Sequence, residues 1–256
     1  MGFFLKIAPF ELSRLRPSDR RSALLLTFYF FLAMATVILI KSLQNALYIT
    51  EVGVTWLPAL YIALALLSGP IVLLYRYLAG RYSPLLLSTA TLATLAVGLV
   101  GFWILKDRTG DWIYQGFYLW CAIFSVLVPT QGWFVSYNLF SPRTAKKVFV
   151  VLGMGGILGG VFGGYYTAVT ATYFGFSGLF IHVLILLLTL EIVLVMVLFV
   201  IPASCERSLK ADLVFPRLPH GAGPVKRLLR SRFLVALAGL ILMTAFTSTL
   251  IDLQFK

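Results

Sequence analysis

The chain has 256 residues, of which 60% are hydrophobic, and its mean hydropathy is +0.96. Charged residues make up only 12%, about half the share that is usual in soluble domains. These values exclude an ordinary soluble protein and predict an all-α, polytopic membrane helix bundle. The formal net charge of +12 is no sign of nucleic-acid binding here, because the basic residues fall in loops between apolar runs, and we expect no nucleic-acid partner.

Apolar runs divide the chain into predicted elements. Residues 1–21 combine aromatic and basic residues, which predicts a short interfacial helix on the cytoplasmic membrane surface. Residues 203–232 form a polar, basic loop, and residues 233–256 predict the start of a seventh span. Between these segments, residues 22–202 form a six-helix transmembrane half, with spans at about 22–48, 56–78, 84–105, 112–140, 147–170 and 177–202.

The basic residues mark one side of the membrane. Seventeen of the 21 Lys and Arg residues fall in residues 1–21, in the loops after the second and fourth spans, or in residues 203–232. Loops on the other side carry only Lys106 and Arg108. Because Lys and Arg are enriched in cytoplasmic loops, we expect a cytoplasmic N-terminus in the inner (plasma) membrane. The predicted outer interface carries three tryptophans typical of an aromatic belt, Trp56, Trp103 and Trp112.

The first span ends with polar residues inside an otherwise apolar run. Lys41 and Asn45 are four residues apart and Gln44 is three residues from Lys41, so a helix places them on one face. One cation and two amides at membrane depth are suited to line a polar path for a substrate. Alternatively, Lys41 snorkels to the far interface, since it lies 20 residues, about 30 Å along a helix, beyond Arg21.

Later spans contain further polar candidates. Gln131 and Asn138 lie in the fourth span and are suited to hydrogen-bond a substrate. Glu191 is the only carboxylate well inside a span. A carboxylate at membrane depth is by default a candidate functional residue. It is suited to couple protons or to pair with a cation such as Lys41; the alternative is a protonated carboxyl bonded to a neighbour. Three basic residues follow the fourth span, namely Arg143, Lys146 and Lys147. They either mark the cytoplasmic side of the membrane or attract an anionic substrate.

A glycine-rich stretch lies in the fifth span, where residues 153–164 read GMGGILGGVFGG. A phosphate-binding loop is excluded because no strand precedes it and no Lys-Ser or Lys-Thr follows it. Spacings of three and four residues put glycines on one helix face and predict close packing of another helix, either static or as part of a rocking motion. The predicted packing residues are Gly155, Gly156, Gly159, Gly160 and Gly163.

The first and seventh spans resemble each other. Each begins after basic residues, and 20 residues separate Arg21 from Lys41 just as 20 residues separate Arg232 from Asp252. Two six-helix halves joined by a cytoplasmic loop are the major facilitator plan, so we expect a missing C-terminal half as a partner. Asp252 and Lys256 are candidates for coupling or ion pairing, or pair with each other.

The chain shows no constellation of catalytic or ligating side chains. It contains no plausible Ser-His-Asp arrangement, no paired carboxylates and no His/Cys cluster. We therefore expect no enzymatic activity, no cofactor and no metal site.

Four stretches together resemble the nucleotide transporters, the ATP/ADP antiporter family of plastids and intracellular bacteria. They are ILIKSLQNALYITEVGVTWLPALYI, YRYLAGRYSP, NLFSPRTAKKVFVVLGMGGILGG and STLIDLQFK, and the likeness spans nearly all of residues 22–256. The resemblance implies twelve helices in a branch of the major facilitator fold. It also implies transport of a small organic anion, a nucleotide such as ATP or ADP first, across the lipid bilayer by alternating access or exchange.

The resemblance also implies site residues. The family's first span carries a basic residue and, after two positions, a Lys-Asp pair; Lys41 matches the first, while Gln44 and Asn45 replace the pair. Asn138 lies where the family has Asn or Asp before an arginine, and Gln131 is a further amide for the cargo. Two alternatives stay open: a facilitator for another solute with Glu191 as proton carrier, and a non-transporting scaffold that binds a partner through the basic loop.

Overall fold

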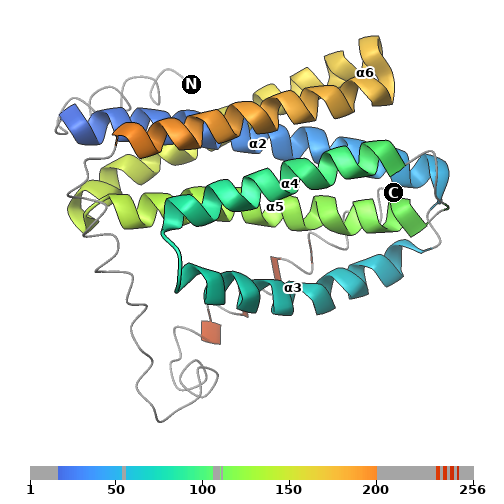
Figure 1. Ribbon diagram of the computed structural model, residues 1–256, viewed down its shortest axis with the longest axis horizontal. Helices are drawn as coiled ribbons and strands as arrows, with labels where there is room; N and C mark the ends of the chain where they lie inside the picture. Colours follow the sequence, from blue (N-terminus) through green and yellow to red (C-terminus); the bar gives the residue numbers. More distant parts are fainter. Residues whose placement is uncertain are drawn as a thin grey trace. The chain divides into compact units, whose positions relative to one another are not determined.

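The computed structural model of the protein describes residues 17–53, 56–105, 110 and 112–200, and seven helical residues between 235 and 247. Within these ranges the fold is all-α and contains no strand. Each long helix is apolar enough, by length and composition, to cross a membrane. The five helices are α2 (Pro17–Glu51), α3 (Leu57–Ala79), α4 (Pro84–Leu105), α5 (Trp112–Leu139) and α6 (Pro142–Val200) (Figure 1).

The chain divides into two compact units, Met1–Ala211 and Asp212–Lys256. In the second unit the described residues are helical, and the Thr244 hydroxyl donates to the Leu240 carbonyl at 2.6 Å. The predicted loop at 203–232 and the end of the predicted seventh span, with Asp252 and Lys256, lie outside the described residues. The predicted interfacial segment differs at its end, because α2 begins at Pro17 and already includes residues 17–21.

The element α6 consists of two helical arms that double back on each other. Gly175 separates them with φ 61° and ψ −160°, a conformation outside the helical region. Tyr166 and His182 lie on opposite sides of this break, and their ring centroids are 5.6 Å apart. Sixteen residues of straight helix would separate them by about 24 Å. Figure 1 shows the reversal, so residues 142–174 (the first arm) and 176–200 (the second arm) are two helical segments, each long enough to cross a membrane. With α2 to α5, the described part of the first unit holds six such segments.

Local sequence explains where the helices begin and end. Ser83 and Ser141 precede α4 and α6, and each is followed by a proline in the first helical position, where its missing N–H costs nothing. The Ser83 hydroxyl accepts a hydrogen bond from the Leu86 N–H at 3.4 Å, as a helix cap does. After α2, Gly53 adopts φ 81° and donates its N–H to the Tyr48 carbonyl at 3.1 Å, which ends that helix.

Helix α2 packs at the centre of the first unit, against α5 and both arms of α6, whereas α3 lies at the periphery and is largely exposed. Three glycines of the first arm make the closest approach to α2. A Cβ atom at Gly155 would lie 2.6 Å from the Thr27 carbonyl oxygen, and one at Gly163 would lie 2.7 Å from Ala35 Cα. The contacts pair Gly155 with Thr27, Gly159 with Phe31 and Gly163 with Ala35.

These three contacts advance by four residues on both helices, so α2 and the first arm run parallel and share one stripe. The remaining predicted packing glycines behave differently. A Cβ at Gly156 would lie in ordinary contact, 3.5 Å from Met34 Cγ, while one at Gly160 would meet no atom within 4 Å. Gly160 therefore takes no part in the close approach, because it lies to one side of the stripe.

The predicted aromatic belt is also divided. Trp56 and Trp112 are 59% and 63% exposed at the ends of α3 and α5 that share one side of the bundle. Trp103 instead turns inward and packs edge-on against Phe180 of the second arm, with ring centroids 4.8 Å apart. Its indole is half-buried, so only two of the three tryptophans are placed as belt residues.

The turn at Gly175 yields a stability prediction. Alanine at this position places a Cβ in a backbone conformation that L-residues rarely adopt, so we expect Gly175→Ala to destabilise the protein by about 1–3 kcal/mol. Gly164→Ala is the matched control, because Gly164 is helical and a Cβ there would meet nothing within 4 Å. Thermal unfolding in detergent measures both variants, and equal midpoints would contradict the strained turn.

Candidate functional site

Most hydroxyl side chains in the helices are satisfied by their own helix. Each donates to a carbonyl one turn earlier, at 2.7 to 2.8 Å in four examples. This arrangement pairs these four hydroxyls within their own helix, as a membrane interior requires. The four examples are Thr27, Thr36, Ser136 and Thr167.

Gln131 departs from this pattern. Its side chain is fully buried on α5, and neither the amide oxygen nor the amide nitrogen has a hydrogen-bond partner among the described residues. Tyr29 of α2 packs beside it: the Tyr29 hydroxyl donates to the Val128 carbonyl at 3.0 Å, and its ring lies against Gly132. A buried amide without partners costs about 1–3 kcal/mol, so stability alone does not explain Gln131.

Glu191 is the second exception. It lies half-buried on the second arm of α6, and its Oε2 atom is buried with no hydrogen-bond partner in the described part of the chain. The Tyr29 hydroxyl lies near Glu191 and near Tyr75 of α3. The Tyr75 ring in turn packs against Phe134 of α5, with centroids 6.2 Å apart. We call Tyr29, Tyr75, Gln131 and Glu191 the core polar cluster.

Three members of the core polar cluster lie at similar depths. Tyr29 follows Arg21 by eight residues, Gln131 precedes the end of α5 by eight, and Glu191 precedes the end of α6 by nine. At 1.5 Å per residue, each lies about 12–14 Å from the same side of the bundle. Three elements, α2, α5 and the second arm, therefore bring polar groups to similar depths inside an apolar bundle. Tyr75 precedes the end of α3 by four residues, so it lies about 6 Å from that side. Tyr29 and Tyr75 were not among the predicted site residues; a hydroxyl inside an apolar span is the signal in the sequence that indicates them.

The polar end of α2 is not part of this cluster. Lys41 lies twelve residues beyond Tyr29, about 18 Å along the helix axis. Its side chain is exposed, whereas Gln44 is only 5% exposed and Asn45 is half-buried. The predicted common face is thus divided between solvent and core. The structure contains no ion pair between Lys41 and Glu191, because the two side chains lie at different depths.

Asn138 occupies a third level. It lies seven residues beyond Gln131, near the end of α5, and its Nδ2 donates to the Phe134 carbonyl at 2.7 Å. That bond already satisfies one of its donors within its own helix. The predicted substrate-binding residues therefore do not form one site: Lys41, Gln44 and Asn45 lie toward one side, Gln131 lies in the core polar cluster, and Asn138 lies toward the other side.

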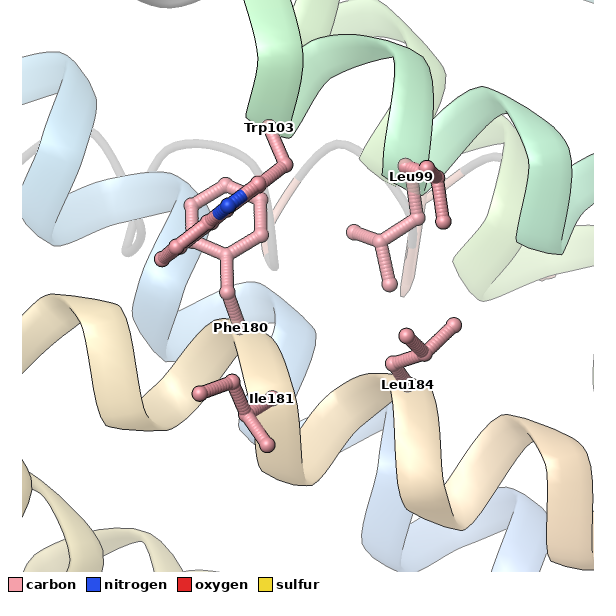
Figure 2. A pocket seen from close by; sticks show the side chains of 6 residues that line it. Leu99, Trp103, Phe180, Ile181 and Leu184 are labelled. Carbon is pink, nitrogen blue, oxygen red and sulfur yellow. The ribbon is translucent and has the colours of Figure 1, made fainter.

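A separate apolar pocket of about 140 Å³ lies between α4 and the second arm of α6. Figure 2 shows Trp103 and Phe180 packed together at one end, with Leu99 and Leu184 beyond them. Val100 and Ile181 complete the lining. None of the described residues that line this pocket is charged, so it suits an alkyl group rather than phosphate or another polar cargo.

Nothing matched this chain in comparisons with protein-family models, curated proteins and solved structures. The resemblance to nucleotide transporters therefore stays a prediction from the residues quoted above.

Proposed function

We propose that the protein is a membrane transporter that moves a small organic anion, with a nucleotide as first choice, by alternating access or exchange. The observation that carries this proposal is the core polar cluster. A helix bundle that only anchors or scaffolds has no use for an uncompensated amide and carboxyl in its interior, whereas transporters place such groups where ions or substrates pass. The six apolar segments supply the bundle in which the cluster is held.

Lys41 supports the choice of an anion. Its exposed ammonium lies on the central helix, twenty residues from the start of the apolar run, and has no ion pair among the described residues. A cation beside low-dielectric surroundings attracts phosphate or carboxylate more strongly than a cation in water. The buried Gln44 and half-buried Asn45 lie within one turn of it and supply amide groups.

Uptake of labelled ATP, ADP and other anions into proteoliposomes tests this proposal. We expect Lys41→Met to raise the KM for the transported anion by tenfold or more, because the variant loses the attraction between the ammonium and the anion. A tenfold change corresponds to about 1.4 kcal/mol. Lys41→Arg keeps the charge and should retain most of the affinity. An unchanged KM for every anion tested in Lys41→Met would refute the role of Lys41.

Proton coupling to a different solute is the second candidate, and Glu191 favours it. The carboxyl is the one acid in the core polar cluster, and its buried Oε2 has no hydrogen-bond partner in the described part of the chain. If uptake responds to a pH gradient but not to internal nucleotide, this candidate replaces nucleotide exchange. A requirement for internal nucleotide would instead support exchange.

A further inference from the structure

A second pocket, of about 230 Å³, lies on the side of the bundle opposite the start of α2. It is formed where α2 and α4 end and where α5 and the second arm of α6 begin. Its lining includes five aromatic side chains and one carboxylate, namely Phe102, Tyr114, Phe117, Phe176, Phe180 and Glu51. We call this the aromatic pocket.

The aromatic walls hold one another in place. Phe102 and Phe117 meet edge to face with ring centroids 5.0 Å apart, and Phe117 stacks on Phe180 at 5.4 Å. Phe117 is 3% exposed and Phe180 is 5% exposed, so both rings are fixed in the core. Phe176 is 44% exposed and lies at the rim. The pocket is therefore largely pre-formed, which reduces the ordering that binding requires.

The charge of the aromatic pocket selects its ligand. Glu51, the last residue of α2, is exposed and carries the only formal charge among the described residues that line the pocket. Aromatic ring faces are electronegative and attract cations, most strongly where water is excluded. An anion would meet Glu51 unfavourably, and a bare metal ion would find one carboxylate and mostly carbon. An alkylated ammonium satisfies both features, because its charge meets Glu51 and its methyl groups meet the rings.

We propose that the aromatic pocket binds a quaternary or tertiary alkylammonium group. Its volume is below the roughly 300 Å³ at which drug-sized pockets begin, which fits a headgroup-sized cation. The ligand is either a free organic cation or the trimethylammonium headgroup of a lipid in the outer leaflet. This site is distinct from Lys41 and from the core polar cluster, and the inference stands whether or not the cargo is an anion.

Calorimetry on the full-length purified protein, in a detergent without ammonium groups, tests the proposal. Tetramethylammonium and choline are the probes, and the neutral isostere 3,3-dimethylbutan-1-ol is the control. We expect saturable binding of both cations and at least tenfold weaker binding of the alcohol. Glu51→Gln, a change at an exposed position, should weaken cation binding by tenfold or more. Phe176→Leu at the rim should weaken it as well, without disturbing the buried rings.

The source of the ammonium group is resolved in nanodiscs. If a lipid headgroup fills the pocket, choline binding seen in phosphatidylglycerol nanodiscs should be lost in phosphatidylcholine nanodiscs, and Glu51→Gln should remove that difference. If the ligand is a free cation, choline binding should be equal in both. The proposal is overturned if neither cation binds in detergent or in phosphatidylglycerol, if the alcohol binds equally well, or if Glu51→Gln leaves cation affinity unchanged.

Discussion

Gly159→Ala is expected to destabilise the protein by about 1–3 kcal/mol, whereas Gly160→Ala is expected to leave stability unchanged or raise it by up to about 1 kcal/mol. The two residues are neighbours in one helix and undergo the same chemical change. A Cβ at Gly159 would collide with the backbone carbonyl of Phe31 on the central helix, and backbone cannot move aside as a flexible side chain can. A Cβ at Gly160 would meet nothing within 4 Å, and alanine favours helix over glycine.

Thermal or denaturant unfolding in detergent micelles measures this difference. Gly155→Ala and Gly163→Ala should resemble Gly159→Ala, because a Cβ at either position would also approach the α2 backbone. If Gly160→Ala proves as damaging as Gly159→Ala, the stripe that contacts α2 is wrongly identified. If neither variant changes stability, the two helices do not approach each other closely.

The second large effect is expected at the core polar cluster, where stability and transport should respond in opposite directions. Gln131→Met keeps the volume of the side chain but removes an amide that has no partner among the described residues. We expect stability to be unchanged or higher by up to about 1–3 kcal/mol, because the unsatisfied polar atoms are gone. Uptake should nevertheless fall by tenfold or more, since the cluster loses a group that we propose interacts with the moving ion or solute.

Glu191→Gln completes this test. It removes the acid of the cluster while keeping its shape, so any dependence of uptake on a pH gradient should disappear. Asp19→Asn is the matched control, because it also removes one carboxylate but lies in the first turn of α2, outside the cluster. Uptake by this variant should still depend on the pH gradient. The double variant of Gln131 and Glu191 should be no worse than the more affected single variant, because the two residues would act as one unit. If both single variants keep full uptake and an unaltered response to pH, the proposed role of the core polar cluster in transport is refuted.

Much of the helical layout follows from sequence, because an apolar run of about 20 residues has few other structures open to it. The predicted spans at 84–105 and 112–140 differ from α4 and α5 by no more than one residue at either end. The reversal inside α6 falls in the predicted gap between 170 and 177, where Gly175 permits a backbone conformation closed to other residues. At the start of α2 the prediction is five residues late, since polar residues extend the helix beyond the apolar run.

The candidate site could not be assembled from sequence in the same way. Helical periodicity groups residues within one helix but gives no relative depth for residues on different helices, so Lys41 and Gln131 were predicted to share a cargo site although they lie at different levels. Periodicity also gives no absolute direction for a face: Gly159 and Gly160 are equally small, and only the position of α2 distinguishes them. Tyr29 is part of the cluster through a contact that no local pattern reveals, since its hydroxyl donates to the carbonyl of Val128, 99 positions away.

The doubled-back α6 has a consequence for how the protein enters the membrane. No Asp, Glu, Lys or Arg occurs between Lys147 and Glu191, so the tip of the hairpin carries no formal charge of these types. Moving such residues through the bilayer centre costs about 2.5–3.5 kcal/mol each on the scale of the cellular insertion machinery. The two arms can therefore partition together as a single helical hairpin, with both of its ends on the same side of the bilayer. Biogenesis of this segment then requires no separate signal to translocate a polar loop.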